Sequence, residues 1–350
     1  MAYTTIKKPS DYFNTVTWTG TGDATTTVSG VGFQPDWTWI KNRSVADDNG
    51  LFDVNRGVEK VLFSNSTGAE STNTESLTSW NSDGFVTGNH RGTGGDAGNL
   101  MVSWNWLGAN GTASNTDGSI TSTVSANTTS GFSIVSYTGT GANATIGHGL
   151  GTAPSMIIIK NRDEIQSWIV GITSNVFTWS SDYLRLNLTD AKSTDGGGTL
   201  FSSAPTSSLI NVGSNTATNG SSDNMIAYCF AEKKGFSKFG SYTGNGNADG
   251  TFIYTGFKPA FLIVKRTDNI NNWTMYDNKR ANSFNEITHT LIANASDAEA
   301  TSTTDDDCDF LSNGVKMRCS NNGSNGSGAS YIYMAFAEEP LVGDNPATAR

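Results

Sequence analysis

The sequence predicts an all-β protein made of three tandem β-sandwich modules of the jelly-roll or lectin-like kind. Gly, Ser, Thr and Asn supply 159 of the 350 residues, whereas a helical protein would be richer in Ala, Leu, Glu and Lys. Hydrophobic residues at 36% and aromatic residues at 10% are too abundant for a disordered chain. Turn-forming residues recur at intervals of about 8 to 12 residues, a spacing typical of sandwiches and jelly rolls.

An internal repeat divides the chain into the three modules. Each copy opens on an aromatic residue followed by a Gly-rich turn, and each reaches a lysine 23 residues later, at the end of an apolar run. The aromatic residues and their lysines are Trp18 with Lys41, Tyr137 with Lys160, and Tyr242 with Lys265. Each module also closes on an apolar segment that reads as a strand.

The repeat fixes the expected boundaries. We expect a docking segment at 1–15, modules at 16–108, 131–234 and 235–340, a linker at 109–130 and a tail at 341–350. Residues 109–130 have few large apolar side chains, which is typical of a linker or a long surface excursion. The boundary between modules two and three has few residues between the two expected modules. We therefore expect modules two and three to lie closer to each other than to module one, each module with its own core.

The apolar runs give the best-defined strands. Met156–Lys160 and Phe261–Lys265 read as buried strands, because they are short, rich in β-branched residues and bounded by proline and polar residues. Pro35, Pro154 and Pro259 stand just before the strand in each module, where a missing N–H costs little.

Charge excludes several classes of partner. Lys and Arg total 22 against 32 Asp and Glu, a net charge of −10, and no basic run is present. Nucleic acid and anionic membrane surfaces are therefore not expected partners. No apolar stretch reaches the roughly 18 residues that suggest a membrane span, and the N-terminus has no apolar signal core. We expect synthesis in a cytoplasm without export by a cleaved signal.

The sequence predicts no enzyme. It carries no nucleophile-elbow, zincin or phosphate-loop motif, and the acids show no alternating pattern typical of a glycosidase pair. The histidines have no ligand spacing with the cysteines, so zinc is not expected and no cofactor is implied. Cys229, Cys308 and Cys319 read as buried or idle thiols rather than a disulfide framework.

The densest acidic cluster is a candidate calcium site. Four carboxylates within five residues offer the oxygen ligands that Ca²⁺ prefers. The cluster consists of Asp305, Asp306, Asp307 and Asp309. A solvated acidic turn leading into the next strand is the alternative interpretation.

An Asp-x-x-Arg pair recurs in two modules. Asp53 and Arg56 match Asp277 and Arg280 in register, whereas Ile172 takes the aspartate position in module two. A bidentate bridge that holds a loop is one interpretation. A polar ligand site is the other, and for it we choose Trp273, Asp277 and Arg280 in module three.

The tryptophans are ambiguous in the same way. Trp37 and Trp39, and Trp104 and Trp106, alternate in pairs along expected strands. One member of each pair should be core, whereas its partner could be a contact or a sugar platform.

The N-terminal segment is basic and aromatic, unlike the rest of the chain. Lys7, Lys8, Tyr12 and Phe13 could dock on another protein of a larger assembly. The same residues could equally form the first edge strand of module one.

Three segments carry a resemblance to a known family. They are Gln34-Pro-Asp-Trp-Thr-Trp-Ile-Lys-Asn-Arg43, Gly235-Phe-Ser-Lys-Phe-Gly-Ser-Tyr-Thr-Gly-Asn-Gly246 and Tyr331-Ile-Tyr-Met-Ala-Phe-Ala-Glu-Glu-Pro340. With the opening segment, and with a closing segment at 345–350 that looks similar, they resemble a family of virion proteins of marine bacteriophages, over nearly the whole chain. The resemblance implies a tail- or fibre-type part with lectin-like β-sandwich modules. It supplies no catalytic residues.

The expected function follows from the resemblance and the composition. We expect a tail fibre or appendage that contacts the host surface, located in the virion and made in the host bacterial cytoplasm. The alternatives are a capsid decoration protein and, third, a carbohydrate-active enzyme. The expected partners are other virion proteins, further copies of the chain, with a homotrimer as our first choice, and a host surface glycan met by loops of module three.

Overall fold

The structure is a computed structural model that describes residues 4–280, 285–301 and 306–348. The predicted all-β class is confirmed, because strands and turns make up nearly the whole of these ranges. Two short helices interrupt them: the 3-10 turn η1 (Pro9–Asp11) and the single-turn helix α1 (Thr216–Asn219). No helix in the described ranges has the length and hydrophobicity needed to span a bilayer.

The first lobe comprises strands β1 to β9. Its larger sheet is ordered β1 (Phe13–Thr19), β9 (Leu100–Trp106), β3 (Trp37–Asn42), β4 (Gly50–Asp53), β5 (Lys60–Phe63) and β6 (Ser71–Thr72). Its smaller sheet is ordered β2 (Thr26–Ser29), β8 (Gly84–Thr87) and β7 (Leu77–Asn81). Apolar side chains from both sheets, such as Ile40 and Phe85, fill the space between them.

The second lobe comprises strands β10 to β19. Its larger sheet is ordered β10 (Ala113–Asn115), β11 (Ser122–Asn127), β12 (Phe132–Thr138), β19 (Asn224–Phe230), β14 (Met156–Asn161), β15 (Ile169–Ile172), β16 (Asp182–Arg185) and β17 (Ser193–Thr194). Its smaller sheet pairs β13 (Ala144–Gly147) with β18 (Leu209–Val212). The segment expected as a linker thus carries β10 and β11, which extend this sheet beyond β12.

The third lobe comprises strands β20 to β28. Its larger sheet is ordered β20 (Ser237–Thr243), β28 (Ser330–Pro340), β22 (Phe257–Arg266), β23 (Trp273–Asp277), β24 (His289–Ile292) and β25 (Ala300–Thr301). Its smaller sheet is ordered β21 (Phe252–Tyr254), β27 (Gly314–Met317) and β26 (Cys308–Leu311). The order of its central strands repeats that of the first lobe.

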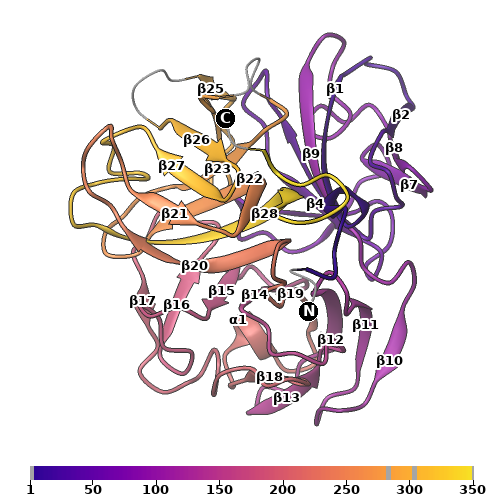
Figure 1. The fold of residues 1–350 in the computed structure, drawn as a ribbon. Helices are drawn as coiled ribbons and strands as arrows, with labels where there is room; N and C mark the ends of the chain where they lie inside the picture. Colours follow the sequence, from indigo (N-terminus) through magenta and orange to yellow (C-terminus); the bar gives the residue numbers. More distant parts are fainter. Residues whose placement is uncertain (1–3, 281–284, 302–305, 349–350) are drawn as a thin grey trace.

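The larger sheets meet one another at the centre of the molecule. Figure 1 shows the three lobes around a common middle, the third in orange and yellow, the first in indigo and purple, and the second in magenta and pink. Trp106 shows how close they come, because its ring centroid lies 6.5 Å from that of Phe230 and 5.6 Å from that of Phe336. One hydrophobic cluster therefore draws on all three lobes.

This shared core changes the expectation of separate modules. Each lobe has its own apolar filling between its two sheets, but the opposite face of each larger sheet is buried against the other lobes. All six residues of β3 and of β14 are buried for this reason. The alternating tryptophans Trp37, Trp39, Trp104 and Trp106 are all core residues, each at most 1% exposed.

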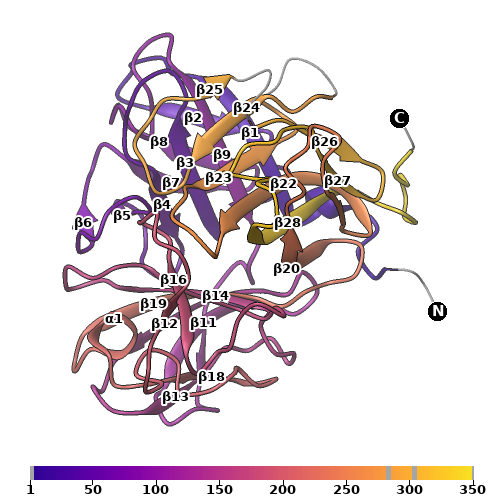
Figure 2. The ribbon, with the colours of Figure 1, turned by 90° about the vertical axis from the view of Figure 1, so that its left-hand side faces the viewer.

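The strands run between two opposite sides of the molecule. Phe13 pairs with Trp106 at one end of the first lobe, and Asn42 pairs with Met101 at the other. Figure 2 shows both chain ends on one side. We call this the terminal side, and the opposite side, with the loops that follow β3, β14 and β22, the loop side.

Candidate functional site

The structure places the predicted ligand residues of the third lobe close together but buries them. Trp273 is 1% exposed, Asp277 0% and Arg280 2%. The indole N–H of Trp273 donates to the carbonyl of Arg185 in the second lobe, at 2.9 Å. The three side chains therefore present no surface to a ligand. They lie where lobes meet.

Asp277 and Arg280 belong to the contact between the third and first lobes, here called junction 3/1. Arg280 Nε donates to Asp277 at 2.5 Å, and the indole N–H of Trp104 donates to the same carboxylate at 2.9 Å. Arg280 also donates to Glu299 at 2.8 Å, and Arg43 of the first lobe donates to both oxygens of Glu299. This bridge between lobes is fully bonded and buried.

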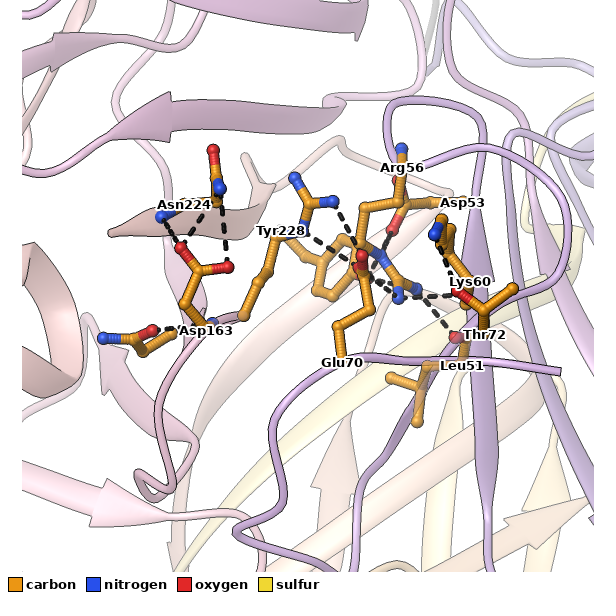
Figure 3. Close-up of polar contacts among 11 residues, drawn as sticks. Leu51, Asp53, Arg56, Lys60, Glu70, Thr72, Asp163, Asn224 and Tyr228 are labelled. Atoms are coloured by element: carbon orange, nitrogen blue, oxygen red, sulfur yellow. Dashed lines mark hydrogen bonds and ion pairs between the residues drawn. The ribbon is translucent and has the colours of Figure 1, made fainter. Parts of the chain in front are cut away.

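The same arrangement recurs at junction 1/2, drawn in Figure 3. Arg56 is bonded to Asp53, and the hydroxyl of Tyr228 in the second lobe donates to Asp53 at 2.7 Å. Glu70 accepts from Arg56 at 3.3 Å and from two nitrogens of Arg162 of the second lobe, at 2.9 and 2.8 Å. The Asp-x-x-Arg pairs are thus structural bridges between lobes.

Neighbouring carboxylates keep these buried arginines charged. Burial by itself lowers the pKa of the Arg56 guanidinium, but the nearby Asp53, Tyr228 and Glu70 raise it above its ordinary value. Burial opposes the ionised form of Arg280 in the same way, and Asp277 with Glu299 raises its pKa. Each buried arginine therefore needs the neighbouring carboxylates to stabilise its charged form.

At junction 2/3, between the second and third lobes, other residues stand at the positions of the Asp–Arg–Glu bridge. Ile172 stands at the aspartate position and Asn175 at the arginine position. Lys192 takes the place of the bridging glutamate, and its backbone N–H donates to the carbonyl of Thr267 at 2.8 Å. Met334 takes the place of Trp104 and Tyr228 and packs in the same apolar core as Ile172. The hydrogen-bond donor is therefore absent where the aspartate is absent.

The three repeated lysines also serve the junctions. Each is 0% exposed, and each ammonium donates to a carbonyl of the lobe on one side of it: Lys41 to Ser296 at 2.7 Å, Lys160 to Thr67 at 3.2 Å, and Lys265 to Thr189 at 3.1 Å. Burial lowers the pKa of each to about 8. The contacts run from third to first, first to second and second to third lobe, so they close a ring.

The sequence did not single out the partners of these bridges. Tyr228, Glu70 and Glu299 were missed, and Trp104 was named only as a core or contact residue, because a single copy of the repeat shows no pairing. A comparison of the copies contained the signal: the fifth residue of each closing strand, Trp104, Tyr228 or Met334, has a side-chain N–H or O–H only where an aspartate exists for it to meet.

The acidic turn is less exposed than a solvated turn would be. Asp307 is 2% exposed and Asp309 6%, and Arg318 donates to Asp309 at 2.5 Å. Ser324 donates to Asp306 at 3.1 Å, and Asp305 lies outside the described residues. No group of three or more His, Cys, Asp or Glu in the described part of the chain is placed to hold a metal ion.

The N-terminal residues divide between surface and core. The side chains of Lys7 and Lys8 are 68% and 64% exposed. Phe13 is 1% exposed, opens β1 and stacks on Phe336 at 5.0 Å, and Tyr12 packs edge-on against Phe236. Of the four candidate docking residues, the two lysines are exposed, Tyr12 is half-buried and Phe13 is buried. Phe13 fits the interpretation as part of the first edge strand.

The three thiols and the imidazole of His148 are buried. Cys229, Cys308 and Cys319 are buried free thiols, and burial raises the pKa of each. Burial lowers the pKa of His148, whose ring lies 3.1 Å from the carbonyl of Thr206. Thiols held in the neutral form are poor nucleophiles.

One cavity of ligand size stands out, on the terminal side. Its volume is about 350 Å³, and it lies between the N-terminal segment, the start of β1 and the end of β28. Near the equivalent place at junction 1/2, burial raises the pKa of Asp36 to about 6, although backbone N–H groups of Asn110 and Gly108 oppose this. The aspartate in the lining of the cavity is Asp344, which belongs to the segment after β28.

These features define a three-lobed all-β protein whose lobes are locked together by buried polar bridges around a shared aromatic core. Residues 8–340 match the model of a family described as a domain of unknown function, DUF7483. The chain belongs to this family. No curated protein matches it.

Proposed function

We propose that the protein is a non-enzymatic structural component of a bacteriophage virion, an appendage that contacts the host surface. One observation carries this proposal. The charged side chains that most resemble a site, Asp53 with Arg56 and Asp277 with Arg280, are buried and fully used in holding lobes together. Buried ion pairs that hold the lobes rigidly together suit a part that must keep its shape outside a cell. The sequence resemblance gives the virion context.

The distribution of exposed side chains supports a contact face on the loop side. Ile165 and Ile270 are 74% and 68% exposed and occupy equivalent positions, five residues after Lys160 and Lys265. The backbone around each loop is fixed, because Gln166 and Asn271 donate their N–H groups to carbonyls of the neighbouring lobe. Rigid loops with exposed apolar tips are typical of contact surfaces.

A homo-oligomer, with a trimer as first choice, remains part of the proposal, as does a host glycan as ligand. Exposed tryptophans would favour a multimer, but all nine tryptophans are buried or half-buried and give it no support. Light scattering of the isolated protein decides between a single chain and a multimer.

Labelling of intact particles tests the proposal. Antibody against the protein, coupled to gold, should mark the tail or its fibres in electron micrographs. Label spread evenly over the capsid shell would support a decoration protein instead. Absence of the protein from purified particles, measured by mass spectrometry, would reject a virion role altogether.

A further inference from the structure

Two aromatic side chains in the described ranges are exposed, and they lie on one strand. Phe252 is 42% exposed and Tyr254 is 56% exposed, whereas the other Phe, Tyr and Trp side chains of these ranges are buried or half-buried. Both belong to β21, and Ile253 between them is 3% exposed. Side chains two residues apart on a strand point to the same face. Both rings therefore stand on the outer face of the small sheet of the third lobe, which Figure 1 shows at the periphery of the molecule.

The other two lobes carry no aromatic residue at these positions. In the first lobe the equivalent strand is β2, which pairs with β8 as β21 pairs with β27, and it has Thr27 and Ser29. In the second lobe the equivalent strand is β13, with Thr145 and Gly147 around a buried isoleucine. Since two lobes form this strand without exposed rings, the rings are not required for folding and are free for another role.

The Phe252 ring rests on the backbone of β27. A β-carbon added to Gly314 would lie 2.7 Å from Cζ of Phe252, so the ring occupies the space of the missing side chain. The strand pairing itself requires this glycine, because an added β-carbon would also meet a backbone oxygen of β21 at 2.2 Å. At the equivalent Gly84 it would meet one of β2 at 2.1 Å. The ring is thus supported by packing before any ligand arrives, which lowers the entropic cost of binding.

An ion pair lies beside the Phe252 ring. Lys316 is the cross-strand partner of Phe252, and its ammonium is bonded to Asp249 at 2.8 Å. In the first lobe the corresponding cross-strand pair is Thr27 and Val86, which carries no charge. The side chains of Lys316 and Asp249 are 22% and 83% exposed. The pair has no net charge and offers both hydrogen-bond donors and acceptors to a ligand on the ring.

A small cavity lies beside the Tyr254 ring. Its volume is about 200 Å³, and Ser237 and Thr255 are among the residues that line it together with Tyr254. A second ion pair completes the lining, in which Lys238 is bonded to Glu232 at 2.6 Å and each side chain is about one third exposed, 35% and 34%. The cavity therefore combines one aromatic wall with several hydrogen-bonding groups, and it has room for a single sugar ring.

This combination suits a neutral oligosaccharide. A sugar ring has a face of C–H bonds that packs on an aromatic ring, whereas the hydroxyls around its rim need donors and acceptors. Phe252 and Tyr254 lie about 6–7 Å apart along the strand, a spacing that lets them serve neighbouring units of one sugar chain.

Charge and area exclude the other kinds of ligand. Both ion pairs are neutral as a whole, and the chain has a net charge of −10, so an acidic sugar would be repelled. A protein partner would need a larger continuous apolar area, whereas here two rings are flanked by charged pairs. Hydroxyl groups are the ligand chemistry that both ion pairs can bind without competing charge.

We propose that the outer face of the third lobe binds a neutral oligosaccharide, with one sugar unit on the Phe252 ring and a neighbouring unit on the Tyr254 ring. The ion pair beside each ring holds the hydroxyls of the unit that the ring supports. The site lies on the face of the small sheet, away from the buried Trp273. That the oligosaccharide belongs to the surface of a host rests on the proposed function, whereas the binding itself does not.

The first experiment measures binding by the full chain. Cellohexaose, maltohexaose, chitohexaose and mannohexaose serve as probes in saturation-transfer NMR titrations, and the wild type should bind at least one of them. Phe252→Thr with Tyr254→Ser, which carries the residues of the first lobe, should weaken this binding by about tenfold or more. Its melting temperature should not change, because both side chains are exposed. Leu100→Thr, at an exposed apolar residue of the first lobe, is the control and should bind normally.

Three results would overturn the proposal. One is a wild-type protein that binds none of the four probes, and another is undiminished binding in the double variant. The third comes from Phe252→Leu with Tyr254→Leu, which keeps apolar surface but has no flat ring face. This variant should lose sugar binding as well, and binding at the wild-type level would show that the rings are not platforms for sugar units. Sedimentation velocity adds a check, because a change of oligomeric state in the Thr/Ser variant would make the rings a contact between copies and would also overturn the proposal.

The second experiment separates the site from the proposed function. Phage carrying Phe252→Thr with Tyr254→Ser should adsorb several-fold more slowly, and the probe that binds the isolated protein should slow adsorption of wild-type phage. Normal adsorption by particles that contain the variant protein would overturn the assignment of the oligosaccharide to the host. Particles that lack the protein would reject the virion function, and the NMR titrations would then judge the binding site by themselves.

Discussion

The hydroxyl of Tyr228 donates to a carboxylate oxygen of Asp53 at 2.7 Å, across 175 residues of sequence and the boundary between two lobes. Tyr228 is 0% exposed, and burial keeps its pKa well above the ordinary value. The hydroxyl therefore keeps its proton, and remains a donor, at pH values at which an exposed tyrosine would ionise. Asp53 receives this bond together with that of Arg56, so one carboxylate connects a loop of its own lobe to the next lobe.

Removal of Asp53 should strongly destabilise the protein. Asp53→Ala leaves Arg56 buried with a weakened set of partners, and a loss of about 3–5 kcal/mol in the free energy of unfolding is expected. Denaturation in urea measures it. Asp163→Ala is the control, because its bonds to Asn224 lie at the surface and should contribute less than about 1 kcal/mol. Equal losses in the two variants would contradict the bridge.

The stability lost in Asp53→Ala should be recovered when the residues of junction 2/3 are copied into junction 1/2. Junction 2/3 has the apolar pair Ile172 and Met334 where junction 1/2 has Asp53 and Tyr228. The transferred substitutions are Asp53→Ile, Arg56→Asn, Glu70→Lys, Arg162→Thr and Tyr228→Met. The combined variant should be more stable than Asp53→Ala alone, since buried ion pairs can be replaced by apolar groups at little cost.

The indole N–H of Trp104 should matter more than that of Trp39. Both side chains are 0% exposed, but only Trp104 donates to a carboxylate, that of Asp277, whereas the Trp39 nitrogen has no partner in the described ranges. Trp104→Phe should therefore cost about 1.5–3 kcal/mol more than Trp39→Phe in urea denaturation. Similar losses of unfolding free energy in the two variants would show that the size of the ring, and not its N–H group, determines the loss.

The three junction lysines predict a rise of stability with pH in the alkaline range. Burial lowers their pKa values to about 8 in the folded chain, whereas in the unfolded chain they lie near 10.5. Between these values the unfolded chain binds more protons, so the free energy of unfolding increases as pH rises. Lys160→Met should flatten this slope between about pH 8 and pH 10. Lys8→Met, at the surface, should leave it unchanged.

The acidic turn should tolerate substitution poorly. An exposed turn would lose less than about 0.5 kcal/mol in Asp306→Ala with Asp307→Ala. Because Asp307 is buried and Asp306 accepts from Ser324, we expect a loss above about 1 kcal/mol. Thermal unfolding with and without a calcium chelator checks this. A wild-type melting temperature that falls on chelation would identify a calcium site there.

The loop-side isoleucines should affect attachment rather than folding. Ile165→Asp with Ile270→Asp changes two exposed side chains, so unfolding should shift by less than about 0.5 kcal/mol. If the loop side meets the host, phage carrying the pair should adsorb several-fold more slowly. Val58→Asp, after β4 and away from these loops, should adsorb normally. Normal adsorption by the double variant would favour a decoration protein.

The repeat predicted much of the fold, because equivalent residues keep equivalent places. The 23-residue spacing aligned Lys41, Lys160 and Lys265, and all three lie at junctions with the same kind of bond. The strands around Met156 and Phe261 were predicted by their apolar runs and are present as β14 and β22.

The contact between lobes was not predicted, for a physical reason. A strand buried on both faces carries apolar residues at every position, and sequence alone does not tell which face meets which neighbour. The sequence left open which of Trp37 and Trp39 is core, and the ring of Trp37 stacks 4.4 Å from Tyr228 of another lobe. Residues such as Asp277 and Arg280, typical of a surface site in sequence, were drawn inward because their partners come from a distant segment.

Closure of the ring has a consequence for synthesis. Lys41 bonds to Ser296, which the ribosome adds 255 residues later, or roughly 10 to 50 s at about 5–20 residues per second. During that time the nascent first lobe exposes the tryptophan-rich face that its later neighbours will cover. A chain cut short before β24 would keep this face open permanently. Premature stop codons late in the gene should therefore yield aggregates rather than shortened, soluble protein.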